Sequence, residues 1–239
     1  RVARSTPDRP GSGDTGPMLG LVISIAVVAI AIGAAQWWNS EHQTTKRTLR
    51  TSPRITVSAM AHAAQPGRLV GVAEVVDGTL TSPVTGRPCV FYQATIEELV
   101  STGKSSQWRQ RAHERRGVVF ALRDETGRAL VDAATARIAL TIDGRSQSGV
   151  FDDATAAEQA FLARHGMSSS GWFLNKRLRY HEAVIEPGER IAVLGRGEAE
   201  PDPDGATGGG YREGPALRVV ITGTAKAPVL LSDHPDALR

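Results

Sequence analysis

The chain contains a single cysteine, Cys89, among 239 residues. It follows a turn-rich segment, Ser82–Pro88, and begins an alternating stretch that favours a strand. Three roles are open to it: nucleophile, metal ligand or packed core residue. A nucleophilic thiol needs its pKa lowered by a nearby cation or a helix N-terminus. The closest basic residue in the sequence is Arg87, two residues before Cys89. Because free cysteine is usually buried, we expect Cys89 to be a packed core residue. If the chain has a catalytic residue, Cys89 is the candidate.

The histidines and paired carboxylates form no recognised catalytic motif. The six histidines show neither an HxH nor an HExxH spacing. Glu97 and Glu98 are adjacent in a predicted strand, where neighbouring side chains point to opposite faces. Asp152 and Asp153 precede a predicted helix and suit a capping role. The sequence therefore predicts no metal and no cofactor.

A basic stretch with one aromatic residue, Trp108–Arg116 (WRQRAHERR), is the sharpest charge feature. On a regular strand, Arg109, Arg111 and Arg115 share one face. With Trp108, they are the candidate contact to an anionic surface, and a solvated strand face is the plainer alternative. The net charge of +3 does not by itself imply nucleic acid, so the sequence predicts no nucleic-acid partner.

An apolar run, Met18–Trp38, lies in a window without charged residues. A helix needs about 20 apolar residues to cross a bilayer, and Trp37 and Trp38 fit an interfacial aromatic belt. A cleaved signal peptide has a shorter apolar region of about 7–15 residues. We therefore expect one transmembrane helix at 18–38, with the lipid bilayer as its partner and single-pass localisation in the cell membrane.

The rest of the chain divides by composition. Residues 1–17 are predicted to be a disordered tail, residues 39–67 a juxtamembrane linker and residues 234–239 a C-terminal tail. Residues 68–233 alternate short apolar runs with turn sequences and lack the βαβ alternation of a parallel sheet. Within them, the Gly-, Pro- and Asp-rich residues 199–215 are predicted to be a mobile loop.

Turn sequences separate the predicted strands. Asp124–Gly127 and Glu186–Glu189 are each predicted to join a hairpin, and Ala154–His165 is predicted to be the clearest soluble helix. The predicted fold class is α+β: a mainly antiparallel β domain with one or two short helices, preceded by one transmembrane helix. A barrel is one arrangement that suits this pattern.

Several separated segments carry a resemblance to a known family. They are Ser82–Tyr92 (SPVTGRPCVFY), Val118–Asp132 (VVFALRDETGRALVD), Arg179–Gly195 (RYHEAVIEPGERIAVLG), Leu217–Gly223 (LRVVITG) and Ala227–Asp233 (APVLLSD). In order and spacing, they resemble the GIDE or beside-a-membrane (BAM) domain over about residues 68–233. The resemblance implies a bacterial relative of the membrane-anchored mitochondrial and chloroplast E3 ubiquitin ligases, in which the domain lies between two membrane helices.

The sequence departs from those ligases in its zinc ligands. A RING finger needs eight Cys or His ligands in paired spacings, whereas these residues include one cysteine. The resemblance therefore implies a RING-less, non-enzymatic interaction or sensing module. It would bind a protein or lipid-related partner beside the bilayer, with stress response as one role. Two alternatives stay open: an E3 ubiquitin-ligase-like component that recruits substrate, and a Cys89-dependent enzyme.

The resemblance also bears on topology. Both flanks of residues 18–38 are basic, so the positive-inside rule alone leaves the orientation open. The two-helix relatives place the domain across the membrane from the N-terminus, which would keep Arg1, Arg4 and Arg9 in the cytoplasm. The domain is therefore expected outside the cytoplasm, and if the protein continues beyond Arg239, a second transmembrane helix is the expected next element. The sequence leaves the partner protein and the oligomeric state open.

Overall fold

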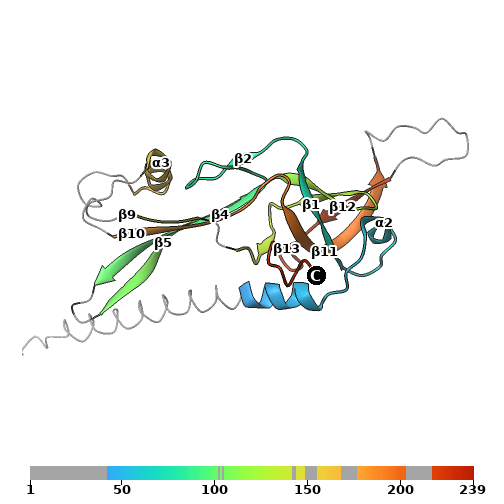
Figure 1. Cartoon of the computed structure of the whole chain (residues 1–239), viewed down its shortest axis with the longest axis horizontal. Coiled ribbons are helices and arrows are strands. Elements are labelled where there is room, and N and C mark those ends of the chain that lie inside the picture. Colours follow the sequence, from blue (N-terminus) through green and yellow to red (C-terminus); the bar gives the residue numbers. More distant parts are fainter. Residues whose placement is uncertain are drawn as a thin grey trace, which may run out of the picture. The chain divides into compact units, whose positions relative to one another are not determined.

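Figure 1 shows the computed structural model of the chain. It describes residues 42–101, 103, 105–141, 144–148, 155–167, 177–202 and 217–239. The predicted tail at 1–17 and the predicted transmembrane helix at 18–38 lie outside these residues. About half of the described residues are in strands. The described helical segments are short: residues 42–51, α2 (Val57–Met60) and α3 (Ala156–Arg164).

These helix lengths correct the predicted membrane architecture. A helix needs about 20 residues to cross a bilayer. Within the part of the chain that the structure describes, no helix is both long enough and apolar enough to do so. The finding corrects the predicted fold class with its preceding transmembrane helix, and it corrects the predicted single-pass localisation. What the structure shows is a mostly β-sheet fold.

Five strands close into a barrel. They pair in the order β1 (Gly67–Val75), β6 (Val119–Arg123), β7 (Arg128–Asp132), β12 (Leu217–Thr222) and β11 (Arg190–Pro201), and β11 pairs back to β1. All these pairs are antiparallel except β7 with β12. Counted along the chain, the first, second, third, fifth and fourth strands close the ring, which is the topology of an OB-fold. Two short strands, β13 (Leu230–Ser232) and β8 (Arg137–Ile138), extend the sheet beyond β11.

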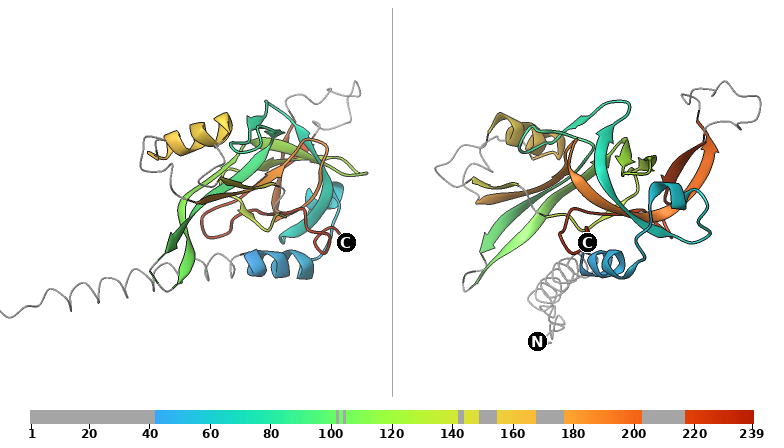
Figure 2. Two further views of the ribbon diagram at one scale, coloured as in Figure 1. Left: turned by 60° about the vertical axis from the view of Figure 1, so that its left-hand side comes forward. Right: turned by 45° about the vertical axis from the view of Figure 1, so that its right-hand side comes forward.

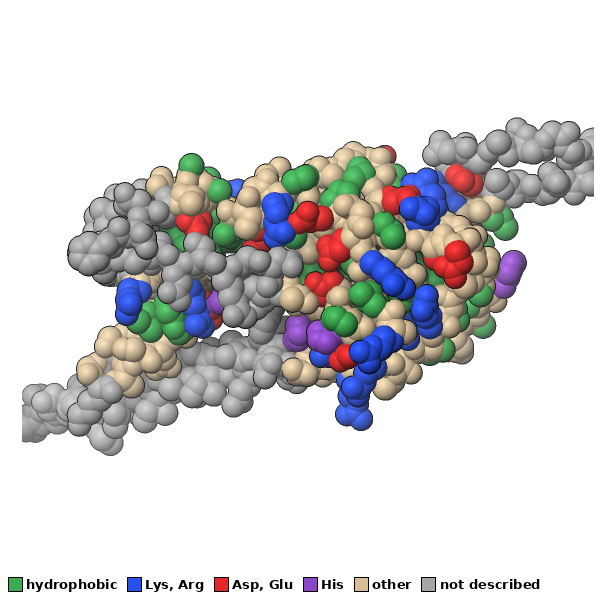
Figure 3. Space-filling model, viewed as in Figure 1, with side chains coloured by type: hydrophobic (Ala, Val, Ile, Leu, Met, Phe, Trp, Pro, Cys, Tyr) green, Lys and Arg blue, Asp and Glu red, His purple; other side chains and the backbone are tan. Residues whose placement is uncertain are grey.

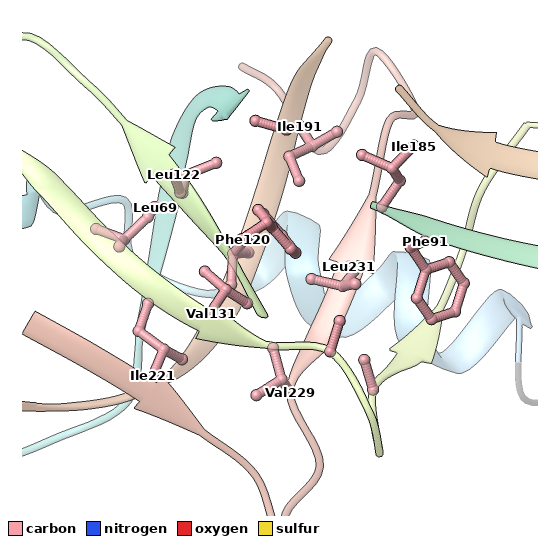
Figure 4. Packing of buried hydrophobic residues seen from close by; sticks show 14 of the residues in the cluster. Leu69, Phe91, Phe120, Leu122, Val131, Ile185, Ile191, Ile221, Val229 and Leu231 are labelled. Atoms are coloured by element: carbon pink, nitrogen blue, oxygen red, sulfur yellow. The ribbon is translucent and has the colours of Figure 1, made fainter. Parts of the chain in front are cut away.

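The barrel interior is apolar. Successive side chains on a strand point to opposite faces, so every second residue of each barrel strand enters the core. Figure 4 shows side chains from different strands pointing toward one another, among them Leu69, Phe120, Leu122, Val131, Ile191 and Ile221, all of which are 0% exposed. Burying a side chain of this size stabilises the fold by about 1.5–3 kcal/mol.

A second sheet, of four antiparallel strands, extends to one side of the barrel (Figure 2). Its order is β5 (Ser106–Gly117), β4 (Phe91–Ser101), β10 (Leu178–Ile185) and β9 (Gly144–Ser148). In the chain, β4 and β5 are inserted between β1 and β6, and β9, α3 and β10 between β7 and β11. One face is covered by α3, whose Phe161 and Leu162 pack with Ile96 and Tyr180.

The two predicted hairpins differ in outcome. The Asp124–Gly127 turn joins β6 to β7, which pair as predicted. The Glu186–Glu189 turn is also present, but the predicted hairpin is wrong because β10 and β11 belong to different sheets. The turn is bonded to β1 instead: Gly188 N donates to Ala73 O at 2.8 Å, and Ala73 N donates to Glu189 O at 2.8 Å. The chain therefore crosses from the four-stranded sheet into the barrel at this turn.

The predicted helix at 154–165 is α3, with a different cap. The Thr155 hydroxyl accepts a hydrogen bond from Glu158 N at 3.3 Å, and the Glu158 carboxylate accepts one from Thr155 N at 2.8 Å. This reciprocal pair is a capping box. The predicted caps, Asp152 and Asp153, lie outside the described residues.

Segments predicted as linker, loop and tail take part in the fold. Leu49, in the helical residues 42–51, packs with Val70 of β1 and with Ala237. The buried Arg68 guanidinium donates to Ala237 O at 3.1 Å and to Arg239 O at 3.0 Å. Residues 199–201 of the predicted mobile loop belong to β11, and its residues 203–215 are not described. Described parts of the predicted linker and tail thus cover the outside of the barrel.

Candidate functional site

The segment Ser82–Arg87 forms a loop between β2 (Leu80–Thr81) and β3 (Pro88–Cys89), and Glu182 of β10 holds it. The Glu182 carboxylate accepts hydrogen bonds from Val84 N at 2.8 Å, from Thr85 N at 3.1 Å and from the Thr85 hydroxyl. Glu182 is 1% exposed. A buried carboxylate is costly unless its oxygens are hydrogen-bonded, so this contact fixes the loop onto the sheet.

Contacts within the loop complete its shape. Ser82 N donates to Arg87 O at 2.9 Å, and Arg87 N donates to the Ser82 hydroxyl at 3.0 Å. Gly86 has a φ of 70°, a left-handed conformation that glycine adopts without strain. At the surface, Arg87 forms an ion pair with Glu186 of the turn that leads into β11. The loop therefore contacts β10 through Glu182 and the turn before the barrel strand β11 through Arg87.

Cys89 lies in a closed environment. It is 0% exposed and packs with Leu80, Tyr92 and Val184. Its Sγ donates to Leu80 O at 3.7 Å. Burial, reinforced by the Glu182 carboxylate, raises the pKa of the thiol to about 12. Since the thiolate is the nucleophile, this environment favours the packing interpretation over the catalytic one.

A second carboxylate, Glu114 of β5, connects the four-stranded sheet to α3. The Tyr92 hydroxyl donates to Glu114, and His165 Nε2 lies 3.0 Å from its Oε2. The Arg164 guanidinium is 3.7 Å from the same oxygen. Burial opposes ionisation of Glu114, but the hydrogen bonds from Tyr92 and His165, together with the charges of Arg164 and His165, lower the pKa of the carboxyl. Glu114 therefore tethers the C-terminal end of α3 to the sheet.

The residues predicted to contact an anionic surface lie on β5, which is not a regular strand. Ile96 of β4 faces Ala112, whereas the next residue, Glu97, faces Gln110. Arg111 is thus the extra residue of a β-bulge. The bulge changes which side chains share a face, because it breaks the two-residue alternation on which the prediction depended.

The candidate residues are consequently divided between the two faces of the sheet. Arg109 lies opposite Glu98, and Arg111 forms an ion pair with Glu98 at 2.5 Å, both on the face that α3 covers. Trp108 and Arg115 lie on the other face. The structure therefore brings the four residues onto one strand but not into one surface.

Trp108 belongs to a cluster on the face away from α3. The Arg179 guanidinium carbon lies 4.3 Å from the centroid of its ring, within the range of a cation–π contact. Arg179 also forms an ion pair with Glu97, and His181 Nε2 lies 3.2 Å from a Glu97 oxygen. This cluster joins β4, β5 and β10 on that face.

Charged side chains are dispersed on the face of the molecule that Figure 3 presents. Figure 3 shows basic side chains in separate groups, interspersed with acidic ones, rather than in one continuous patch on the face it presents. Among the described residues, no group of three or more His, Cys, Asp or Glu side chains could hold a metal ion.

Sequence reasoning missed Glu182, Glu114 and Arg179. Each makes its contacts across the sheet to residues far away in the chain, which spacing cannot reveal. One local signal was present for Glu182: it directly precedes the apolar end of β10, where Ala183, Val184 and Ile185 are all buried. A carboxylate beside such a run needs buried hydrogen-bond partners.

Comparisons with known proteins yield one family. A search of curated proteins and a search of solved structures each found no match. Residues 92–206 match a family model, GIDE, whose description is "E3 Ubiquitin ligase". The matched range spans the four-stranded sheet, α3 and three of the five barrel strands, and is just under half of the chain. Residues 92–206 are therefore similar to the GIDE family, described as E3 ubiquitin ligase.

Proposed function

We propose that the chain is a non-enzymatic interaction module of the GIDE type that binds a protein partner through the β4–β5 hairpin. One observation carries the proposal. Arg109 and Arg115 of the hairpin are at least partly exposed and form no ion pair with any described residue, whereas Arg111 and Arg179 beside them are paired with Glu98 and Glu97. Unpaired surface charges attract a partner of opposite charge.

The contacts of two carboxylates in the four-stranded sheet support the proposed binding role of the hairpin. Glu182 and Glu114 both act as anchors, one for the loop before β3 and one for α3. Their hydrogen-bond acceptors are engaged within the fold. The sheet is thereby held as a firm base from which the hairpin extends (Figure 1), and binding residues are commonly presented by such a scaffold.

The family match favours a second candidate, an E3 ligase-like component. In that role the domain would recruit a substrate, and another chain would supply the chemistry of ubiquitin transfer. The zinc ligands of a RING finger cannot come from residues that include one cysteine. The bacterial, RING-less identity and the stress-response role remain predictions from the resemblance.

Photocrosslinking tests the interaction function. A benzophenone amino acid replaces Gln107 or Gln110, which flank Arg109 on β5, and Thr222 of β12 serves as the control position on the barrel; all three are exposed. We expect the same discrete protein adduct from positions 107 and 110 in the native cells, and none from position 222. Adducts that are equal at all three positions would contradict the proposal.

Two further measurements separate the candidates. Purified full-length chain, incubated with ubiquitin, activating enzyme and conjugating enzyme, should form no conjugates without an added ligase; conjugates formed by the chain alone would support a ligase. The Cys89→Ala variant should yield the same crosslinked adducts as the unsubstituted chain and complement a deletion strain fully. Loss of complementation with unchanged adducts would favour the Cys89-dependent enzyme.

A further inference from the structure

In the part of the chain that the structure describes, the outer side of β5 is an open sheet edge. β5 is a terminal strand of the four-stranded sheet and, among the described residues, pairs with β4 alone. It is also longer than the other described terminal strands, β8 and β9. An edge strand presents unpaired backbone donors and acceptors, which can pair with a strand from another chain.

The charges of β5 restrict what can pair with this edge. The strand carries four arginines and one glutamate, and that glutamate, Glu114, is occupied by Tyr92 and His165. Two copies of β5 placed side by side would bring like charges together, and like charges directly opposite each other are destabilising. An acidic strand would instead place carboxylates opposite guanidinium groups. The partner that this edge fits is therefore not the same edge of a second copy of the chain.

The bulge at Arg111 decides between a strand and a flat surface. The bulge places Arg109 on the α3 side of the sheet and Arg115 on the opposite side. A planar anionic surface that contacts one face of the sheet therefore meets only one of the two arginines. The side chains of an extended peptide alternate between both faces of a sheet. One strand lying along β5 can reach both arginines.

We propose that the outer edge of β5 adds one strand from an acidic, extended segment of a partner protein. The backbone of the segment pairs with β5, and its carboxylates meet Arg109 on one face of the sheet and Arg115 on the other. The inference rests on the proposed function, since it specifies how the hairpin holds its partner.

The test uses the full chain and a fluorescent peptide of about ten residues, the length of a long strand. Half of its residues are glutamates, placed so that carboxylates fall on both faces when it is extended, and the others are threonine and valine. A second peptide has the same side chains but is N-methylated at its backbone amides, which removes its donors. A third replaces glutamate with lysine.

We expect the first peptide to bind and to slow amide hydrogen exchange in β5 but not in β12. The double variant Arg109→Glu/Arg115→Glu should bind it about tenfold more weakly, because each exposed charge pair contributes modestly. Arg190→Glu is the matched control: Arg190 is exposed, lies on the barrel strand β11 and forms no ion pair with a described residue. It should leave the affinity unchanged. The N-methylated and lysine peptides should not bind.

Two results would overturn the inference. Equal binding of the N-methylated peptide would show that charge alone attracts the segment. Absent peptide binding, with Arg109- and Arg115-dependent capture of phosphatidylglycerol vesicles, would assign the arginines to a lipid surface. If either result is obtained and positions 107 and 110 still give the crosslinked adduct, the chain binds a protein at the hairpin but does not bind it by strand pairing. Loss of the adducts themselves would remove the module.

Discussion

The barrel interior is lined by aliphatic and aromatic side chains, whereas the four-stranded sheet and its helix bury three carboxylates, those of Glu98, Glu158 and Glu182. Each carboxylate has a dedicated partner: Arg111, the cap residue Thr155 and the loop Ser82–Arg87, respectively. Apolar packing tolerates exchange of similar side chains. A buried carboxylate requires its own donors in place. The barrel therefore depends on the alternation of apolar side chains along its strands, whereas the four-stranded sheet depends on individual contacts of buried carboxylates.

This difference predicts separate stabilities. The barrel strands form a closed ring, in which every strand is paired on both sides. The four-stranded sheet has terminal strands, and α3 is held on it by one apolar cluster and by Glu114. Segments with fewer buried apolar contacts open at lower free energy than the global fold. The sheet should therefore open before the barrel.

The largest expected effect compares two fully buried phenylalanines, Phe120 in the barrel and Phe161 in α3, both 0% exposed. Phe120→Ala should lower the free energy of unfolding by about 4 kcal/mol, through lost burial and the cavity left behind. Phe161→Ala should lower the global value less, because α3 can detach locally. Hydrogen exchange should rise in α3 and β10 for Phe161→Ala and throughout the barrel for Phe120→Ala. Equal barrel exchange in both variants would mean that the two regions unfold as one unit.

The next effect concerns Glu182. Glu182→Ala leaves Val84 N, Thr85 N and the Thr85 hydroxyl without their acceptor and should cost about 3 kcal/mol in urea unfolding. Glu186→Ala is the matched control: it removes the surface ion pair with Arg87, where the Glu186 side chain is 40% exposed, and should cost under about 1 kcal/mol. Similar losses in both variants would contradict the anchoring role of Glu182.

A smaller effect appears at alkaline pH. Burial raises the pKa of the Cys89 thiol from 9.0 to about 12, and burial with the hydrogen bond to Glu114 raises the pKa of Tyr92 from 10.0 to about 12. Both groups ionise more readily in the unfolded chain. Their contribution to stability is complete below pH 9 and is lost as the pH rises from 9 toward 12.

Urea titrations between about pH 8 and about pH 11 check this linkage. Cys89→Ala and Tyr92→Phe should each give a shallower fall in unfolding free energy with pH than the unsubstituted chain, because each removes one ionising group from the buried cluster. Unchanged slopes in both variants would show that neither group stays neutral in the fold.

The same contrast explains what the sequence could predict. The Asp124–Gly127 hairpin is readable because its turn and both flanking strands are local, and its pairing was confirmed. Helix α3 was found from its composition, but Thr155 was overlooked as its cap. The Glu186–Glu189 turn was identified while its strands were wrongly paired. A turn sequence specifies a reversal of the chain, not the sheet to which each strand belongs.

The candidate site was less predictable for a physical reason. Trp108–Arg116 was identified as a basic strand, but nothing local marks Arg111 as the extra residue of a bulge. The bulge is a property of pairing with β4, where Glu97 and Glu98 take separate arginine partners. Likewise, Glu182 meets the loop at Val84 and Thr85 across almost a hundred residues of chain. Such contacts follow from the fold and are absent from local spacing.

The smallest expected effect separates the two regions through matched arginines. Arg179 of the sheet pairs with Glu97 and lies over Trp108, whereas Arg218 of the barrel pairs with Glu200 at 2.6 Å and has no aromatic partner among the described residues. Lysine keeps the charge but loses the planar group that stacks on a ring. Arg179→Lys should therefore cost about 0.5–1 kcal/mol in urea unfolding, and Arg218→Lys close to nothing. If both substitutions cost the same, the ring contributes nothing measurable, and the Arg179 contact is an ordinary surface ion pair like that on the barrel.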